Sequence, residues 1–304
     1  MPTAVANHRP VDDTELSIPD GSYRVEGRTV EVTLLGSGDA IGMPVPLCDC
    51  EYCLESEPRC HPALLVETAS TTLVLDAGPT VPEALRHVGA TTPDAFLVTH
   101  AHRDHAWGLF RLLAPAKFPA DFLAAVDGFD ATDPETHTAD HAVYLTETAH
   151  EHLREVTPLR RLDVRRLVSG EPVVFGSETP DAGGDVTVTP FAVDHARPAY
   201  DTLGFVVEAN GRALGYAPDM LGFVDAPPEA DLDLFVTEGA GVLDHPIHGP
   251  PEERRAAVAA VDAARTVLVN VNEHVQRTHT DDLRDRATEL GYELGRDLAS
   301  YELE

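Results

Sequence analysis

Three histidines and one aspartate stand within six positions of one short segment, and all four are common metal-ligating residues. The segment is Thr-His-Ala-His-Arg-Asp-His, residues 99–105. Because residues i and i+2 of an extended segment point the same way, His100 and His102 can converge on one ion, while the turn that follows directs Asp104 and His105 toward a second. Such ligands suit zinc, with manganese or iron as alternatives. The pattern predicts a divalent-cation site rather than a run of surface histidines.

A predicted strand and a predicted helix flank this segment and deliver its side chains. Residues 94–98 are a short apolar run of the length expected for a buried strand, and leucines between 109 and 113 have helical spacing. Two more metal-ligating residues, His195 and Asp219, each stand at the end of a later predicted strand, where loops gather ligands on a rigid scaffold. Alone, each is more simply explained as structural. Together with the histidine segment they indicate one site.

Three of the four cysteines are clustered in Cys-Asp-Cys-Glu-Tyr-Cys, as Cys48, Cys50 and Cys53. Disulfides between cysteines this close are geometrically awkward, whereas thiolates clustered in an intracellular chain typically bind metal. A reduced, metal-free cluster is the alternative. Cys60 stands apart, and we expect it to be a small packed residue.

The charge balance is extreme, with 52 Asp and Glu residues against 22 Lys and Arg and a formal net charge of −30. Such acidity repels polyanions and disfavours nucleic acid as a partner. An acid-rich chain whose single lysine is Lys117 resembles halophilic proteins, in which high salt screens the repulsion. No apolar run approaches the roughly 20 residues of a membrane span, and the N-terminus lacks the features of a secretory signal. We therefore expect a soluble, cytoplasmic protein.

The 304 residues are ample for one large domain. We expect an N-terminal extension over 1–27 and one domain over 28–304, with a solvated acidic insertion or lid at about 114–170. Strands are predicted at 29–35, 63–67, 72–76, 94–98, 185–191, 202–209, 212–217, 233–237, 266–271 and 292–298. Helices are predicted at 82–88, 147–155, 251–264 and 281–290. Two strand-rich halves relayed by helices indicate an α/β protein of two stacked sheets with helices outside.

The order of these residues resembles the metallo-β-lactamase superfamily. His195 follows the histidine segment by about 90 residues, Asp219 comes next, and Asp76 lies in an earlier Leu-Asp-Ala-Gly motif. Within the superfamily the chain is most similar to the PhnP-type cyclic phosphodiesterases, through Leu-Leu-Gly-Ser-Gly at 34–38, the cysteine loop after it, and Gly204-Phe205 after His195. The resemblance runs from about residue 30 to the C-terminus. It implies an αββα sandwich of two mixed sheets with a dinuclear site between them.

The resemblance also assigns ligands by position. The first catalytic cation would be held by three histidines, His100, His102 and His195. The second would be held by Asp104 and His105, with Asp219 bridging both. A separate structural zinc would be held by a Cys3His set, which satisfies a closed tetrahedral site: Cys48, Cys50, Cys53 and His274.

One departure from the family concerns its final catalytic histidine. That position falls on Val271, flanked by Asn270 and Asn272. Valine cannot ligate, and asparagine binds such ions weakly, so the second cation is loose, held with water or an asparagine, or absent. A rival possibility is that His274 serves the dinuclear site and leaves the cysteines one ligand short.

The function implied is a metal-dependent hydrolase, a phosphodiesterase acting on small cyclic or alkyl phosphodiesters. A metal-bound hydroxide would be the nucleophile, since coordination lowers the pKa of water to about 7. Asp104 would also orient it, and His248 would protonate the leaving alkoxide or stabilise the phosphoryl oxygens.

Other functions stay open. The alternatives are another hydrolase of the superfamily, either a tRNA 3′ processing nuclease or a thioester or lactone hydrolase, and a non-catalytic relative like the PQQ biosynthesis protein. No Lys/Arg-rich arm supports the nuclease, and the intact histidine segment disfavours the non-catalytic relative. The expected partner is a small-molecule substrate, with neither nucleic acid nor membrane, and a homodimer is left open.

Overall fold

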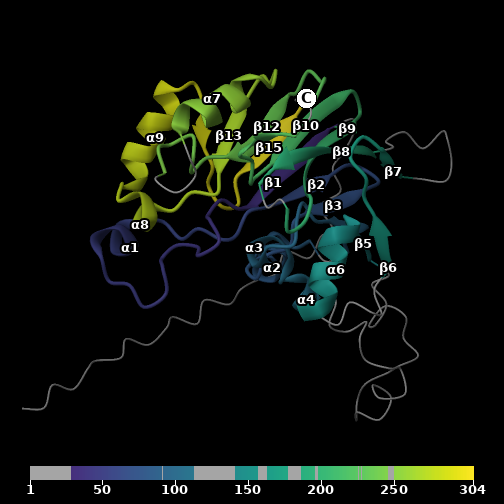
Figure 1. Ribbon diagram of the computed structural model, residues 1–304, viewed down its shortest axis with the longest axis horizontal. Helices are drawn as coiled ribbons and strands as arrows, with labels where there is room; N and C mark the ends of the chain where they lie inside the picture. The colour runs from purple at the N-terminus through teal and green to yellow at the C-terminus, as the bar shows by residue number, and fades with distance from the viewer. Residues whose placement is uncertain are drawn as a thin grey trace, which may run out of the picture.

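The computed structural model describes residues 29–90, 92–112, 141–156, 163–176, 186–195, 198–224, 226, 228–245 and 250–304. Within these residues two β-sheets form the centre of the molecule, and helices lie against the outer face of each (Figure 1). This arrangement confirms the αββα sandwich expected from the sequence. The proposed extension over 1–27 and the candidate His248 lie outside the described residues.

The first sheet has the strand order β15-β1-β2-β3-β4-β5-β6. Its strands are β1 (Val30–Gly36), β2 (Ala63–Glu67), β3 (Thr72–Leu75), β4 (Ala95–Leu97), β5 (Ala142–Leu145), β6 (Asp163–Arg166) and β15 (Ser300–Leu303). Strands β3 to β6 run parallel. The carboxyl ends of β3 and β4 therefore open at one edge, where the chain continues into Asp76 and into the histidine segment.

The second sheet has the strand order β11-β8-β9-β10-β12-β13-β14, and β7 also pairs with β8. Its strands are β7 (Val173–Phe175), β8 (Val186–Asp194), β9 (Thr202–Ala209), β10 (Arg212–Ala217), β11 (Gly222–Phe223), β12 (Leu234–Glu238), β13 (Thr266–Val269) and β14 (Glu293–Leu294). Strands β10, β12 and β13 run parallel. Their carboxyl ends bring Asp219, Glu238 and Asn270 to a common edge.

The helices divide between the two outer faces. On the first sheet lie α2 (Val81–Val88), α3 (Arg103–Ala106), α4 (Leu109–Leu112) and α6 (Glu147–Val156), and on the second lie α7 (Pro251–Ala259) and α9 (Thr280–Glu289) (Figure 1). The short α1 (Glu51–Glu55) and α8 (Glu273–Gln276) contact each other. Helix α7 ends before the predicted 264, since the chain turns at Ala260 into β13.

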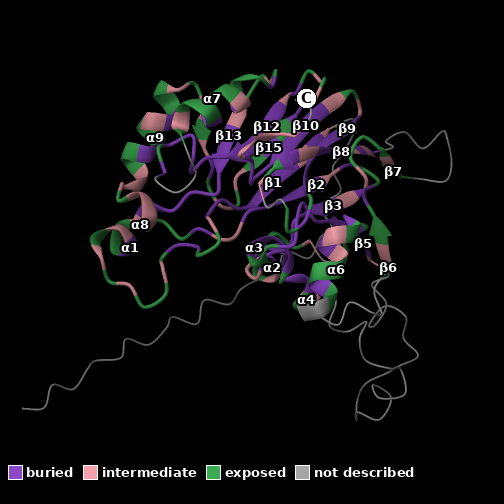
Figure 2. Cartoon of the chain, viewed as in Figure 1, coloured by how far each residue is buried: buried purple, intermediate pink, exposed green. Residues whose placement is uncertain are grey.

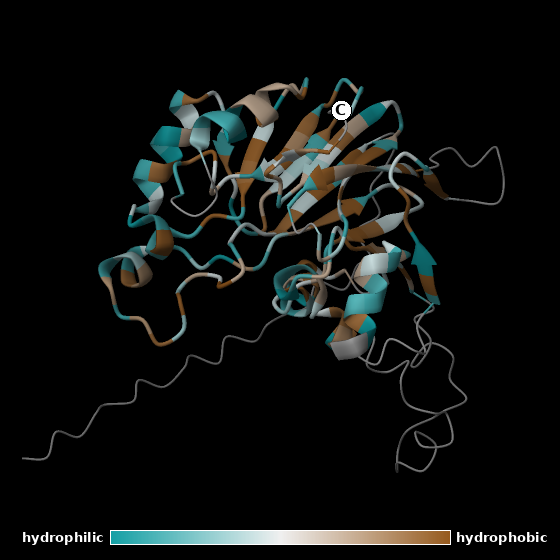
Figure 3. Cartoon of the chain, viewed as in Figure 1, coloured by the Kyte–Doolittle hydropathy of each residue, from teal (hydrophilic) through white to brown (hydrophobic). Residues whose placement is uncertain are grey.

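The core between the sheets consists of alternate strand residues that point inward. Val32, Leu34, Phe205 and Tyr216 are among its fully buried members. Figure 2 shows this buried zone running along the strands, and Figure 3 shows that the strands are mostly hydrophobic while the helices combine hydrophilic and hydrophobic residues. Separate apolar clusters lie under the helices of each face. The sandwich therefore buries both faces of both sheets and leaves strand ends for the site.

Two expected segments differ from the structure. Within 114–170, the segment expected to be a solvated insertion or lid, the helix predicted at 147–155 is present as α6, whereas β5 and β6, which complete the first sheet, were not predicted; residues 113–140 lie outside the described part of the chain. The strand expected at 292–298 is instead two short strands, β14 and β15, which belong to different sheets. Among the described helices, none has the length and apolar character needed to cross a membrane.

Candidate metal centres

Three imidazoles from two sheets converge at the edge where the strands open. His100 and His102 follow β4, and His195 follows β8. His102 Nδ1 lies 2.8 Å from His100 Nε2 and 3.2 Å from His195 Nε2. Tetrahedral zinc with Zn–N bonds of about 2.0–2.1 Å separates two nitrogens by about 3.3 Å. The three side chains predicted to hold a first cation are thus brought together within coordinating reach.

Burial keeps two of these imidazoles, His100 and His102, in the form that binds metal. Burial lowers the pKa of His100 well below its ordinary value, and the neighbouring His105 lowers it further. Burial also lowers the pKa of His102, with His195 as the next cause. A neutral imidazole has a free lone pair for a cation. The donor set therefore fits a bound divalent ion.

A second group forms around His105. Its Nε2 lies 2.6 Å from Asp219 Oδ2 and 3.0 Å from Asp104 Oδ2, yet this fully buried nitrogen makes no hydrogen bond. Carboxylate oxygens this close to a buried imidazole nitrogen, with no hydrogen bond to it, call for an explanation, and a cation held between the imidazole and the carboxylates would supply one. Asp219 Oδ2 is also 3.7 Å from His100 Nε2, so Asp219 faces both groups as a bridging ligand must.

Imidazoles and carboxylates in this pocket shift each other's pKa values. Burial alone would lower the pKa of His105, but the carboxylates of Asp104, Asp76 and Asp219 outweigh it and hold that pKa well above its ordinary value. Burial would raise the pKa of Asp219, yet His195, His105 and His100 hold it well below its ordinary value. A cation in the second group therefore competes with a proton on His105.

Asp76 holds the histidine segment from behind. It is fully buried, with a left-handed φ of 65°. Its Oδ1 accepts hydrogen bonds from the amide and hydroxyl of Thr99 at 2.8 and 2.9 Å. Its Oδ2 lies 2.7 Å from His105 Nδ1 and 3.0 Å from the hydroxyl of Tyr216. Because a carboxylate accepts the Nδ1 proton, His105 turns Nε2 to the pocket.

Gly78, the last residue of the Leu-Asp-Ala-Gly motif, lies against the backbone of the histidine segment. A Cβ atom on Gly78 would lie 1.8 Å from the carbonyl oxygen of Asp104. The backbone of Ala77 also donates to the carbonyl of His105 at 2.7 Å. The Leu-Asp-Ala-Gly sequence is therefore required both for its carboxylate and for the contact that its glycine permits.

The position expected for a final histidine does not face the pocket. Val271 is fully buried in the apolar cluster under α7 and α9. Its neighbour Asn270 reaches the pocket instead, with Nδ2 2.5 Å from Asp219 Oδ1. The structure therefore places an amide, and no imidazole, on this wall of the site.

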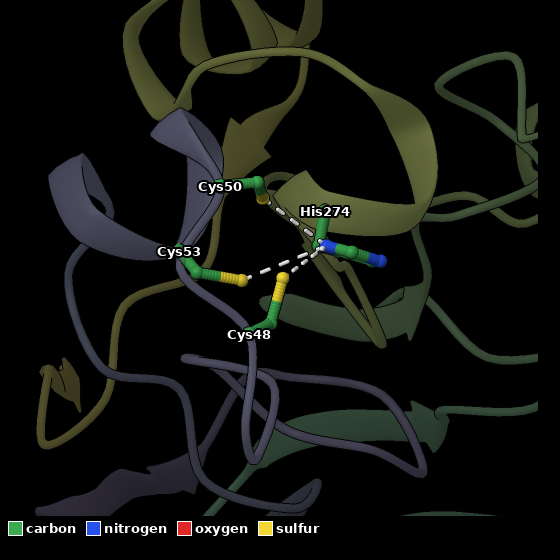
Figure 4. Close-up of side chains that lie close together, drawn as sticks. All are labelled: Cys48, Cys50, Cys53 and His274. Carbon is green, nitrogen blue, oxygen red and sulfur yellow. Dashed lines mark hydrogen bonds between the residues drawn. The ribbon is translucent and has the colours of Figure 1, made fainter.

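The cysteine cluster is complete in the described structure (Figure 4). His274 Nδ1 lies 3.4, 3.3 and 3.6 Å from the sulfurs of Cys48, Cys50 and Cys53. Tetrahedral zinc with Zn–S of about 2.3 Å and Zn–N of about 2.0–2.1 Å separates sulfur from nitrogen by about 3.6 Å. The four donors fit a structural zinc. His274 lies with the cysteines, so the rival arrangement, in which it joins the histidine pocket, does not occur.

Tyr200 is a pocket residue that the sequence did not reveal. Its ring lies 5.5 Å from that of His102 and 5.2 Å from that of His152, measured between centroids. Burial, followed by the charge of Asp104, raises the pKa of Tyr200 to about 12. His152 is exposed, and its ring packs at a tilt against that of Tyr200. No periodic signal marks Tyr200, since it lies in a loop between β8 and β9.

A comparison with known protein families shows which family the chain belongs to. Residues 71–270 match the family model described as a β-lactamase superfamily domain. The match covers most of the chain and includes all six proposed active-site cation ligands. The chain therefore belongs to the β-lactamase superfamily, and it is a hydrolase of the metallo-β-lactamase fold.

Two curated relatives have different names. A ribonuclease Z from Mycolicibacterium gilvum is 27% identical over 228 residues, which are 72% of this chain and 68% of that protein. An octanoyltransferase from Porphyromonas gingivalis is 35% identical over 252 residues, 79% of this chain. The chain spans only 46% of that octanoyltransferase. Neither name by itself defines the activity of this chain.

Solved structures support the fold. A diphosphatase from the PhnP family aligns with a TM-score of 0.64 at 20% identity, covering 90% of this chain and 97% of that chain. Zn²⁺-bound PqqB from Methylobacterium extorquens aligns with a TM-score of 0.63 at 18% identity, covering 90% of this chain and all of that one. At such low identity these likenesses show the architecture alone.

Proposed function

We propose that this chain is a metal-dependent phosphodiesterase that hydrolyses small phosphodiesters. The observation that carries the proposal is that two groups of cation donors share His100 and meet at Asp219. Neighbouring donor groups of this kind are found where two ions act on one phosphoryl centre. A divalent cation held there would supply Lewis acidity and lower the pKa of water to about 7.

The residues of the chain have separate tasks in this proposal. The three histidines His100, His102 and His195 would hold a cation through imidazole nitrogens, while Asp104 and Asp219 add the negative charge that draws a divalent ion. Asp104 also orients the attacking water by accepting a hydrogen bond from it. Tyr200 stays protonated, so its hydroxyl is a donor for a phosphoryl oxygen beside His102. His248 remains the proposed proton donor to the leaving alkoxide, from outside the described residues.

A small substrate fits the charge of the chain better than RNA. The relatives named ribonuclease Z and the fold neighbour named a diphosphatase both suggest cleavage of a P–O bond. RNA binding depends on Lys and Arg contacts to phosphates, and the net charge of −30 opposes it. RNA is therefore the second candidate substrate, favoured only by the names of relatives.

Turnover of bis(p-nitrophenyl) phosphate in high salt with added Mn²⁺ or Zn²⁺ tests the proposal. We expect kcat/KM of His102→Ala to fall at least about 100-fold, because the substitution removes a proposed ligand of the cation that positions the reacting groups. His87→Ala is the matched control, because His87 lies exposed on α2 away from the pocket. Activity that is absent in the wild type, or equal in the two variants, would refute the phosphodiesterase.

Parallel substrates separate the alternatives. A precursor tRNA tests the nuclease, and an acyl thioester and a lactone test the other hydrolases of the superfamily. The thioester also tests whether the relative named an octanoyltransferase has any bearing on this chain. A kcat/KM for one of these that exceeds the value for small phosphodiesters, and falls in His102→Ala, would reassign the substrate while keeping the cation site.

A further inference from the structure

Asn270 occupies the pocket wall next to Asp219 because of its backbone conformation. Strand β13 ends at Val269, and Asn270 then adopts a left-handed φ of 60°. Asparagine tolerates this conformation better than most residues. The turn directs the Asn270 side chain to Asp219, while Val271 enters the apolar cluster. An unusual backbone angle therefore decides which of the two residues borders the cation pocket.

The amide nitrogen of Asn270 is surrounded by hydrogen-bond acceptors. Nδ2 lies 2.5 Å from Asp219 Oδ1, 3.3 Å from the carbonyl oxygen of Pro218 and 3.4 Å from Glu238 Oε2. The ionised carboxylate of Asp219 and the carbonyl of Pro218 only accept. The NH2 group of the amide must therefore face them, and the amide donates to Asp219. Asn270 therefore contacts Asp219 as a hydrogen-bond donor and not through its oxygen.

This hydrogen bond gives the two oxygens of Asp219 different roles. Oδ1 is anchored by Asn270, whereas Oδ2 faces His105 Nε2 at 2.6 Å and His100 Nε2 at 3.7 Å. Outer partners of this kind fix the orientation of metal-binding carboxylates, and their loss typically costs 10–100-fold in metal affinity. Asn270, which turns its NH2 group to Asp219, is thus placed to orient a carboxylate that faces the cation pocket.

We propose that Asn270 is a positioning residue, which holds Asp219 with Oδ2 turned toward His100 and His105 and so strengthens cation binding in this pocket. The inference rests on the cation pocket of the proposed function but not on its substrate. In place of an imidazole ligand at this strand end, the chain anchors the carboxylate that faces both donor groups.

The test is Mn²⁺ binding by the full-length Asn270→Gly variant. Glycine accepts a φ of 60° without strain, so the substitution removes the amide and little else. Unbound Mn²⁺ is measured by its EPR signal, and Mn²⁺ prefers oxygen and nitrogen to thiolate ligands, so the cysteine cluster does not contribute. We expect the affinity for Mn²⁺ to fall about 10–100-fold.

Thr237→Val is the matched control. The Thr237 hydroxyl is fully buried one strand away and donates to the carbonyl of Ala217 at 3.1 Å. Valine removes that bond at nearly equal volume without touching Asp219. We expect the control to bind Mn²⁺ like the wild type even where it lowers the melting temperature.

Wild-type Mn²⁺ affinity in folded Asn270→Gly protein, checked by circular dichroism, would overturn the positioning role. So would an equal loss of affinity in Thr237→Val. Should the glycine variant fail to fold, Asn270→Ser gives the same comparison. The serine hydroxyl ends one bond short of the position of Asn270 Nδ2 and so does not reach Asp219, and the serine side chain leaves a smaller cavity than glycine does. These measurements need no turnover, so failure of the phosphodiesterase proposal would be seen separately.

Discussion

Nε of Arg59 lies 2.7 Å from Oε1 of Glu273, and both side chains are shielded from solvent, at 4% and 0% exposed. Arg59 follows the cysteine loop, and Glu273 directly precedes His274. The guanidinium also donates to the hydroxyl of Ser37 and the carbonyl of Gly295, each at 2.8 Å. The ion pair therefore ties together the two segments that supply the proposed zinc ligands.

We expect Arg59→Met to lower the free energy of unfolding by about 3–5 kcal/mol, because it leaves the Glu273 carboxylate buried and unpaired. Guanidinium chloride unfolding measures the loss. Arg265→Met is the control, since Arg265 pairs with Glu293 at 2.9 Å in an exposed position and such pairs contribute about 0–1 kcal/mol. If Arg59→Met lowered the free energy of unfolding no more than Arg265→Met does, the Arg59–Glu273 ion pair would not hold the two segments together.

Substitution of one thiol tests the structural zinc. We expect Cys50→Ser to contain one zinc fewer per chain than the wild type by inductively coupled plasma mass spectrometry, because its sulfur is one of four converging donors. Cys60→Ser is the control, since Cys60 lies outside that cluster. Equal zinc contents in the two variants would show that the cluster does not hold the ion.

Much of the site could be predicted because its ligands follow short local patterns. The i, i+2 spacing of His100 and His102 already fixes their common direction on an extended segment. The distant ligands His195 and Asp219 could be assigned because each follows a predicted strand and because they come in this order after the histidine segment. Once the parallel strands are in register, their ends meet at one edge, and the structure brings these four residues together.

Other features leave no such pattern. The edge strand β6 is Asp-Val-Arg-Arg and is largely exposed, so no alternation of apolar residues distinguishes it from a loop. The role of Asn270 depends on a positive φ that asparagine permits but does not require. Tyr200 lies beside His100 and His102 from a segment between two strands, and that proximity is a tertiary effect. Sequence spacing predicts periodic elements and motifs better than it predicts single residues of this kind.

Asp76→Asn tests the support of His105. The amide would keep its oxygen toward the donors of Thr99 and turn NH2 toward His105 Nδ1, so the imidazole proton moves to Nε2 and blocks the lone pair that faces the pocket. We expect Mn²⁺ affinity to fall about 10–100-fold, with kcat/KM falling in parallel. Asparagine tolerates the φ of 65° at this position.

Tyr216→Phe is the matched control for that variant. It removes the 3.0 Å hydrogen bond to Asp76 Oδ2 but leaves the contact with His105. We expect its Mn²⁺ affinity to stay near that of the wild type. If Asp76→Asn bound Mn²⁺ no more weakly than Tyr216→Phe, Asp76 would have a structural role alone.

A row of three glutamates crosses the first sheet, and it links stability to pH and salt. Strand register places Glu31 opposite Glu302 on one side and opposite Glu67 on the other. Burial, and then the charge of Glu31, raise the pKa of Glu67 above its ordinary value of 4.5. Because the folded state then holds this proton more tightly than the unfolded state, stability falls as the pH rises from 4.5 through the folded pKa.

Glu31→Gln should therefore stabilise the protein at pH 7 and low salt by about 0.2–1 kcal/mol for each opposed pair. The gain should shrink in 1 M salt, where the Debye length is about 3 Å, and below pH 4.5, where Glu67 is protonated in both states. Urea unfolding at several pH values and salt concentrations measures it. Glu208→Gln is the control, because the residues opposite Glu208 are Ala213 and Thr187 and neither carries a carboxylate. An equal gain in stability in Glu208→Gln would show that the change in net charge, and not relief of repulsion within the glutamate row, stabilises the protein.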